Sequence, residues 1–164
     1  MCTYQGQRFL SEQLASFENQ THTNWELWAS DDGSDDGTIE ILKEFKNRFP
    51  SKKVRIVNGP HQGFLLNFLF ITCNKNIDAN YFAYSDQDDI WKPNKIERAI
   101  NYLKEVKKNV PSLYCSRTEL INSSGQHIGF SPLFNKPPRF ENALIQNIGG
   151  GNTIMKYQRW VIRK

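Results

Sequence analysis

The sequence lacks any apolar stretch long enough to cross a membrane. Its longest apolar run, residues 64–71, is interrupted by Asn67 and falls far short of the roughly 20 residues that a membrane-spanning helix needs. The N-terminus has no charged region followed by an apolar one, as a secretory signal would. These absences predict a cytoplasmic protein. With 38% hydrophobic residues and no low-complexity segment, residues 1–164 are expected to fold as a single domain around a real core.

Cysteines are few, and positive charge is confined to one end of the chain. Cys2, Cys73 and Cys115 form no C-x-x-C pair, which argues against a zinc site or a disulfide framework. The formal net charge of +4 equals the charge of residues 156–164 alone, which contain no acid. Their basic residues are Lys156, Arg159, Arg163 and Lys164. The body of the chain therefore has no basic stripe, and no nucleic-acid partner is expected. The basic end has two readings: peripheral contact with anionic lipid at the inner face of the membrane, or a solvated end of the domain.

Hydrophobic periodicity alternates between strand-like and helical segments. Helical spacing of apolar residues occurs in residues 8–19, 38–49 and 63–72 and again from Pro93, which suits a first helical position. Strand-like segments are residues 25–30, 54–57, 81–85, 113–118, 120–122 and 127–130, and a last helix and strand are expected at 140–146 and 153–155. Residues 123–125 are predicted to form a turn from which 127–130 returns as a hairpin. Strands separated by helices favour β-α-β units. The predicted class is α/β, with a Rossmann-like, mostly parallel sheet and helices on both faces. Because so few residues precede Gly6, the first strand is either missing or a stub.

Two clusters of acidic residues each follow a predicted strand directly. One contains Asp31 and Asp32, and the other contains Asp86, Asp88 and Asp89. The carboxyl ends of parallel strands share one edge of a sheet, so we expect the clusters to converge there although they are far apart in the sequence. Carboxylates gathered at one rim repel one another unless a cation compensates. All-oxygen ligands favour Mg²⁺ or Mn²⁺, which complete their shell with water and substrate phosphates, so the implied substrate carries a diphosphate.

Part of the first cluster has a simpler explanation. Ser34, Asp35 and Asp36 stand just before the second predicted helix, where Ser and Asp are favoured as N-caps. Asp31 and Asp32 lie nearer the end of the strand, where a carboxylate can accept hydrogen bonds from a base or a ribose. The binding interpretation therefore rests on Asp31 and Asp32 and on the second acidic cluster.

Several short motifs follow one another along nearly the whole chain. They are Thr3-Tyr4-Gln5-Gly6, Glu12-Gln13-Leu14, Gln20-Thr21, Trp25-Glu26-Leu27, Ser30-Asp31-Asp32-Gly33-Ser34, Gly63, Asn67-Phe68, Ser85-Asp86-Gln87-Asp88-Asp89-Ile90-Trp91-Lys92-Pro93, Lys95-Ile96 and Gln146-Asn147-Ile148-Gly149-Gly150-Gly151-Asn152-Thr153. In this order they resemble glycosyltransferase family 2, the nucleotide-sugar-dependent enzymes of the GT-A fold, and within it the bacterial rhamnosyltransferase-like members. A lone D-x-D motif would be weak evidence, whereas an ordered series of this length is strong.

The resemblance implies roles for individual positions near the first strands. Thr3 and Tyr4 match the segment that lines the nucleotide base pocket, where an aromatic ring can stack on uracil or thymine. Asp31 matches the carboxylate that contacts the base, and Asp32 is the second member of that motif.

The resemblance also assigns the second half of the site. Asp86 and Asp88 match the D-x-D element, with Asp88 as the direct metal ligand and Asp86 nearer the ribose or a metal-bound water. Gly149, Gly150 and Asn152 belong to the loop that faces the donor sugar and the acceptor. The cofactor implied by this match is Mg²⁺ or Mn²⁺.

The implied activity is metal-assisted, inverting transfer of a sugar from a UDP- or dTDP-linked donor. The acceptor would be a saccharide or a lipid-linked saccharide in bacterial cell-surface polysaccharide synthesis. Relatives use a downstream Asp as the general base, but no acid follows Glu141 here. We therefore expect the base beyond Lys164, and a GT-A domain incomplete at both ends that binds the donor with weak or absent transfer. Two rivals stay open: a non-catalytic nucleotide-binding module, and a metal-dependent phosphatase with an Asp nucleophile after its first strand.

Overall fold

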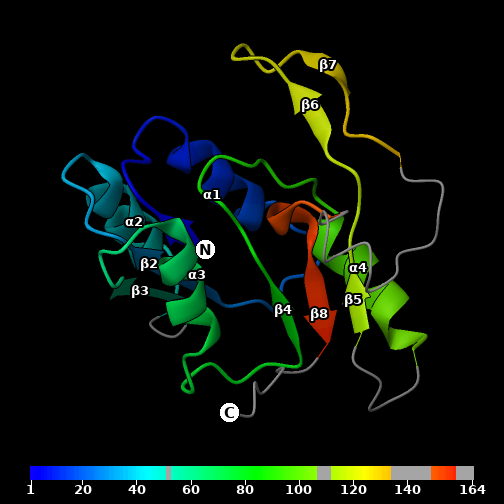
Figure 1. Cartoon of the computed structure of the whole chain (residues 1–164), viewed down its shortest axis with the longest axis horizontal. Helices are drawn as coiled ribbons and strands as arrows, with labels where there is room; N and C mark the ends of the chain where they lie inside the picture. The colour runs from blue at the N-terminus through cyan, green and yellow to red at the C-terminus, as the bar shows by residue number, and fades with distance from the viewer. Residues whose placement is uncertain (51–52, 107–111, 134–148, 158–164) are drawn as a thin grey trace.

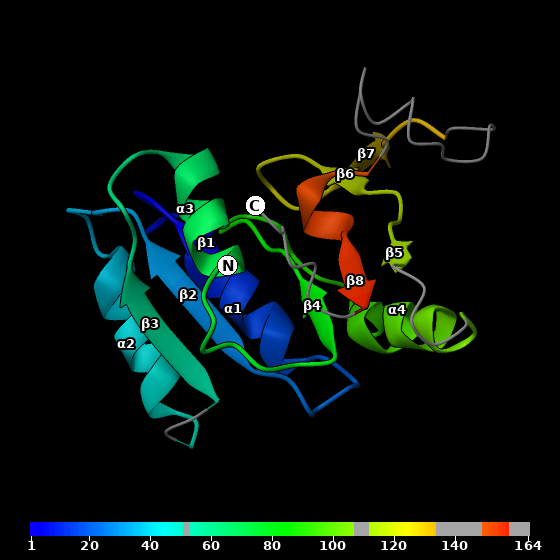
Figure 2. The ribbon, with the colours of Figure 1, turned by 60° about the horizontal axis from the view of Figure 1, so that its bottom comes forward.

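The structure, a computed structural model, describes residues 1–50, 53–106, 112–133 and 149–157. Most of its elements are labelled in Figure 1, and β1 is labelled in Figure 2. They are β1 (Cys2–Thr3), α1 (Leu10–Glu18), β2 (Leu27–Asp31), α2 (Thr38–Asn47), β3 (Val54–Asn58), α3 (Phe64–Thr72), β4 (Tyr81–Ala83), α4 (Lys95–Lys104), β5 (Ser112–Tyr114), β6 (Glu119–Ile121), β7 (His127–Phe130), the 3₁₀ turn η1 (Gly151–Thr153) and β8 (Met155–Tyr157). Strands and helices alternate through the first two thirds of the chain, which confirms the predicted α/β class.

The first three strands form a parallel sheet in the order β1-β2-β3. The short β1 is a stub of two residues, as one of the two expectations had it, and its register with β2 sets Thr3 opposite Asp31. The N-terminal ammonium group donates a hydrogen bond of 2.8 Å to the carbonyl of Trp28. Hydrogen bonds to β2 therefore hold this short strand in the sheet.

Helices cover both faces of this sheet, as expected. Helices α1 and α2 lie on one face and α3 on the other (Figure 2). The core forms mainly beneath α1 and α2, where the largest fully buried side chains include Leu10, Leu14, Leu42 and Phe45. Each of these comes from the apolar positions that repeat at helical spacing in the sequence.

A second sheet has the order β4-β8-β5 and is antiparallel, so only the first sheet has the expected parallel pairing. The amide of Cys2 donates to the carbonyl of Ser85 at 3.3 Å, which joins β1 to the segment that follows β4. Strands β6 and β7 form the expected hairpin, which projects away from the rest of the molecule in Figure 1.

Several expected boundaries are wrong; the strand expected at 113–118, for example, ends at Tyr114. Helix α4 begins at Lys95 after the N-cap Asn94, so Pro93 lies before the helix instead of at its first position. Gly151–Thr153 forms a 3₁₀ turn, and the last strand begins only at Met155. The helix expected at 140–146 lies outside the described residues. In the described part of the chain, no helix is both long and apolar enough to span a membrane.

Candidate functional site

The acidic segments that follow β2 and β4 lie on the two sides of β1. Thr3 pairs with Asp31 on one side, and the Cys2 amide reaches Ser85 on the other. Burial raises the pKa of the Cys2 thiol to about 11, and the nearby carboxylates of Asp86 and Asp32 contribute to that increase. The expected convergence is therefore confirmed: groups from both clusters surround the end of the same short strand.

The Asp31 carboxylate is buried and fully engaged by protein donors. Its Oδ1 accepts hydrogen bonds from the amides of Gly33 at 3.1 Å and Ser34 at 2.8 Å. Its Oδ2 accepts from the hydroxyls of Thr3 and Ser34, both at 2.7 Å. These four bonds occupy the usual capacity of a carboxylate. Direct contact with a nucleotide base would require one of the two hydroxyls to turn away, so the predicted base contact of Asp31 stays a prediction.

The Asp32 carboxylate connects β2 to the start of α3. It accepts the amide of His61 at 2.8 Å and the amide of Gly63 at 2.7 Å. Both donors have positive φ angles, 57° at His61 and 88° at Gly63. A carboxylate that satisfies two amides in such a turn offsets the cost of that backbone conformation. Asp32 therefore shapes the rim of the site, whether or not it also contacts a ligand.

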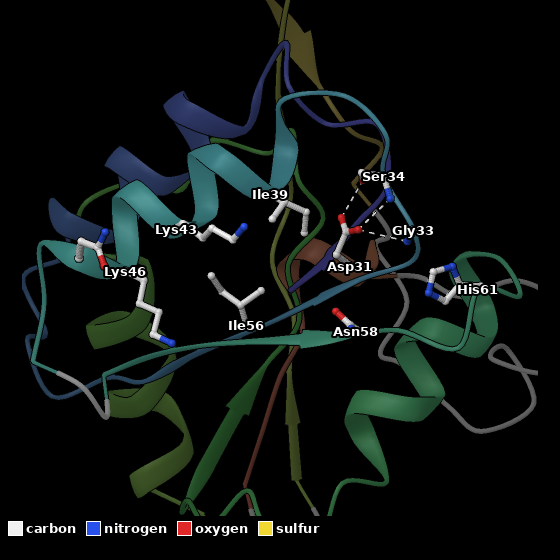
Figure 3. Close-up of a pocket in the computed structure, with 10 residues that line it drawn as sticks. Asp31, Gly33, Ser34, Ile39, Lys43, Lys46, Ile56, Asn58 and His61 are labelled. Carbon is white, nitrogen blue, oxygen red and sulfur yellow. Dashed lines mark hydrogen bonds between the residues drawn. The ribbon is translucent and has the colours of Figure 1, made fainter.

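A cavity of about 670 Å³ opens beside Asp31, between α2 and the edge strand β3. Figure 3 shows the Asp31 carboxylate turned toward Gly33 and Ser34, with His61 at one end of the cavity. Lys43 and Lys46 line the other part, over an apolar floor formed by Ile39 and Ile56. The cavity has the size of an ordinary small-ligand site. Among its lining residues, Asp31 is the only predicted site residue, and none belongs to the second acidic cluster.

Thr3 and Tyr4 differ in their surroundings although both are predicted to line the base pocket. Thr3 is buried, and its hydroxyl donates a hydrogen bond to the Asp31 carboxylate. The Tyr4 side chain is 57% exposed, so its ring is free of the core and can stack on a planar ligand. The adjacent residue Gln5 has a φ of 51°, and its amide donates to Ser34 Oγ at 2.9 Å. The turn after β1 is thus tied to the loop after β2.

Asp86 and Asp88 differ from Asp31 and Asp32 in their lack of protein donors among the residues that the structure describes. Within the described residues, neither carboxylate accepts a hydrogen bond, while Asp86 is half-buried and Asp88 exposed. Burial raises the pKa of Asp86, and the neighbouring charge of Asp88 raises it further. Two unsatisfied oxygen ligands that repel each other fit a hard divalent cation. No group of three or more His, Cys, Asp and Glu side chains in the described ranges could hold a metal by itself, so water and substrate would have to complete the coordination.

Asn152, on the predicted sugar-facing loop, is tied to the loop after β4. The Lys95 ammonium donates to the Asn152 carbonyl at 2.7 Å and lies 4.3 Å from the centroid of the Trp91 ring. A hydrogen bond from the Asn152 side chain lowers the pKa of Asp89, although burial raises it more. Burial lowers the pKa of Lys95 to about 8, against the opposing effect of Asp89. The structure therefore brings Asn152 next to the second acidic cluster.

Gly149 and Gly150 differ in how closely their neighbours approach. A Cβ on the buried Gly149 would stand 2.8 Å from the Cβ of Cys115, so packing requires a glycine there. A Cβ on the exposed Gly150 would stand 2.8 Å from Asn152 Oδ1, the end of a side chain that can turn away. The predicted contact of both glycines with the sugar stays a prediction.

Three buried amide side chains that support the site were not singled out as functional in the sequence. Asn67 donates to the Ser30 carbonyl at 2.9 Å, and Gln13 donates to Ser85 Oγ at 2.8 Å. Gln20 bonds the carbonyl of Lys92 and the amide of Ile96. The signal in the sequence was the position of these polar residues within helical patterns of apolar residues. Their hydrogen-bond partners come from distant segments, which the sequence pattern does not identify.

Replacing Asp86 with asparagine should raise the free energy of unfolding near neutral pH in a buffer without divalent cations. The raised pKa of Asp86 means that its ionised form is less favourable in the folded chain than in the unfolded chain. This destabilisation is absent below the unfolded-state pKa of about 3.9 and complete above the pKa of the folded state. Thermal unfolding of both proteins across that pH range should therefore show an advantage of the variant that disappears in acid.

The matched control for this experiment is Asp78→Asn. Asp78 is exposed and precedes β4, so it lies at the opposite end of that strand from Asp86. Its replacement should leave stability nearly unchanged at every pH. An advantage of Asp86→Asn that is the same in acid and at neutral pH would contradict the electrostatic explanation.

The fold and the site together define an α/β ligand-binding domain with carboxylates at the carboxyl edge of a parallel sheet. The sequence model described as "Glycosyl transferase family 2" matches residues 1–159. The chain therefore belongs to glycosyltransferase family 2.

Curated relatives are glycosyltransferases as well, and solved structures share the fold. The chain is 35% identical over 106 residues to the dTDP-rhamnosyl transferase RfbG of Shigella flexneri, a match covering 63% of this chain and 36% of RfbG. It is 28% identical over 152 residues to WfgD of Escherichia coli, named a UDP-Glc:α-D-GlcNAc-diphosphoundecaprenol β-1,3-glucosyltransferase; that match covers 92% of this chain and 55% of WfgD. The crystal structure of residues 1–349 of TarS from S. aureus in complex with UDP superposes with a TM-score of 0.52 at 20% identity, covering 63% of this chain and 30% of TarS. The chain thus has the GT-A fold and spans between about a third and just over half of these proteins.

Proposed function

We propose that this chain forms the donor-binding part of an inverting, metal-assisted glycosyltransferase. The observation that carries the proposal is the placement of two acidic segments on opposite sides of β1, with the exposed ring of Tyr4 at its end. The ring offers a stacking surface for a base, and the Asp86–Asp88 pair offers ligands for a cation that also binds a diphosphate. The names of RfbG and WfgD support a dTDP- or UDP-linked sugar as the donor.

The chemistry proposed is displacement at the anomeric carbon. An acceptor hydroxyl attacks this carbon in line, a new carbon–oxygen bond forms, and the bond to the nucleoside diphosphate breaks. The hydroxyl proton passes to a general base. Mg²⁺ or Mn²⁺ held by Asp88, with Asp86 beside it, would supply charge neutralisation for the departing diphosphate. The chain's own contribution is to bind and orient the donor: Tyr4 faces the base, and the loop at Gly149, Gly150 and Asn152 faces the sugar.

The acceptor proposed is a saccharide or a lipid-linked saccharide in bacterial cell-surface polysaccharide synthesis. The diphosphoundecaprenol acceptor in the name of WfgD supports this class. Such an acceptor resides in the membrane, so we also propose that the protein works at the inner face, by peripheral association. The basic residues that follow Lys156 in the sequence, Arg159, Arg163 and Lys164, support contact with anionic lipid. Lys156 itself is only 8% exposed, and its ammonium lies 5.4 Å from the centroid of the Phe82 ring.

Calorimetric titration of UDP and dTDP, with and without Mn²⁺, tests the proposal. We expect one of the nucleotides to bind at least about tenfold more tightly with the ion, equivalent to about 1.4 kcal/mol. Asp88→Ala should lose this gain because it removes the ligand that links the ion to the protein. Asp78→Ala, an exposed aspartate at the other end of β4, should retain it. Nucleotide binding that neither the ion nor Asp88→Ala alters would contradict the metal-assisted mechanism.

The two rivals make different predictions in assays of phosphate release and of sugar transfer. A phosphatase would carry an Asp nucleophile after the first strand, but β1 ends at Thr3 and is followed by Tyr4. Release of phosphate from a generic ester without nucleotide preference would favour that rival. A non-catalytic nucleotide-binding module would bind the same nucleotide but show no transfer when extended to the length of the relatives.

A further inference from the structure

Gln87, the residue between the two carboxylates of the D-x-D element, is attached to the turn after β1. The amide of Tyr4 donates to Gln87 Oε1 at 2.8 Å, and Gln87 Nε2 donates to the Tyr4 carbonyl at 2.9 Å. The side chain thus satisfies both backbone groups of Tyr4, as a neighbouring strand would. The two residues are 83 positions apart in the sequence. We call this pair of bonds the Gln87 clamp.

The turn after β1 has space for this clamp because residue 6 is a glycine. A Cβ on Gly6 would stand 2.5 Å from Gln87 Oε1 and 2.8 Å from Gln87 Cδ. Gly6 is held by other bonds as well: its amide donates to Thr38 Oγ1 at 2.8 Å, and its carbonyl accepts the amides of Phe9 and Leu10. Gln87 therefore contacts a rigid turn whose position is set independently by α1 and α2.

Only a primary amide of this length can form the clamp. The Tyr4 amide needs an acceptor and the Tyr4 carbonyl needs a donor, and glutamine supplies both from one planar group. A glutamate would accept from the amide but could not donate to the carbonyl. A methionine would keep the length of the side chain but lose both bonds.

We propose that Gln87 is a positioning residue that couples nucleotide binding at Tyr4 to metal binding at Asp86 and Asp88. This inference rests on the proposed function. Because Gln87 lies directly between the two carboxylates in the sequence, a shift of the Tyr4 turn moves the backbone that carries both of them. Binding of a base at Tyr4 and binding of a cation at the carboxylates then stabilise the same arrangement of the loop. Each ligand should therefore increase the affinity for the other by the same factor.

The test measures this coupling factor in the native chain and in two variants. The affinity for UDP or dTDP, whichever binds more tightly, is titrated with and without Mn²⁺, and the affinity for Mn²⁺ with and without that nucleotide. In the native chain both ratios should be equal and at least about tenfold. In Gln87→Met, which loses the clamp, and in Gly6→Ala, which displaces Gln87 from the turn, both ratios should fall severalfold below the native value, to the part that direct contact of the cation with the diphosphate supplies. Gln126→Met removes an exposed amide from the β6–β7 hairpin and should keep the native ratio.

A purely structural role of Gln87 would lower the thermal stability of the variants and leave the coupling factor unchanged. That result overturns the inference. A native chain whose nucleotide affinity does not respond to Mn²⁺ contradicts the proposed function and removes the coupling with it. If one variant fails to fold, the other decides, because they disturb the clamp from opposite sides.

Discussion

Truncation of Phe45 to alanine should cost about 3 to 5 kcal/mol of unfolding free energy, a large part of the stability of a domain of this size. Phe45 is 1% exposed and lies in the core between α2 and the sheet. Its ring packs 4.9 Å from the centroid of Phe49 at an interplanar angle of 52°. Removing the ring loses this contact and leaves a cavity that the surrounding helices fill only in part. Urea or thermal unfolding monitored by circular dichroism measures the loss.

The matched control uses the same substitution on another helix. Phe64, the first residue of α3, is 80% exposed. Phe64→Ala should change the unfolding free energy by less than about 0.5 kcal/mol, because the side chain already contacts solvent. Equal losses in the two variants would contradict the assignment of the core to the α1 and α2 side of the sheet.

Replacing Asp31 with alanine should cost about 2 to 4 kcal/mol, the second largest effect we expect. The substitution removes the acceptor of four hydrogen bonds, two from backbone amides and two from the hydroxyls of Thr3 and Ser34. Thr3 is buried, so its hydroxyl cannot be compensated fully by water. Unfolding of the native and variant chains without nucleotide isolates this structural contribution from any loss of ligand contact.

Asp35→Ala is the control for that variant. Asp35 belongs to the same acidic segment but is exposed, and it accepts a single hydrogen bond from Gln5 Nε2 at 2.5 Å. Its replacement should cost at most about 1 kcal/mol. If Asp31→Ala were no more destabilising than Asp35→Ala, the bonds of the Asp31 carboxylate would contribute little, and a role in ligand contact alone would account for the residue.

Short-range sequence patterns predicted the helices and turns that neighbouring residues determine. Helix α3 begins directly after Gly63 as expected, and the turn at residues 123–125 joins the expected hairpin. The error at Pro93 has a physical cause: Asn94 takes the N-cap position, so the proline belongs to the preceding turn. The error at the last strand arose because three consecutive glycines set no backbone conformation by themselves. The backbone there forms a 3₁₀ turn, and the Lys95 bond to the Asn152 carbonyl holds it against α4.

The candidate site was predictable in its location and less so in its contacts. The rule that carboxyl ends of parallel strands share an edge placed the acidic segments near Asp31 and Asp86 on either side of β1. It could not predict that the Asp31 carboxylate accepts hydrogen bonds from Thr3, Gly33 and Ser34. Nor could it predict that the carboxylates of Asp86 and Asp88 accept none in the described part of the chain. The two hydrogen bonds between the Gln87 side chain and the Tyr4 backbone were not predictable either, because in the sequence Gln87 is only the residue between two aspartates.

By itself, the sequence determined the α/β class, the membership in glycosyltransferase family 2 and the order of the helices and strands that build the first sheet. These follow from residue periodicity and ordered motifs, which act over a few neighbouring positions. Only the tertiary structure decided the antiparallel pairing of the second sheet, the use of each carboxylate and the contact between Gln87 and Tyr4. Such contacts join residues far apart in the chain, and a polar side chain acquires its partner only when the backbone has brought the two together.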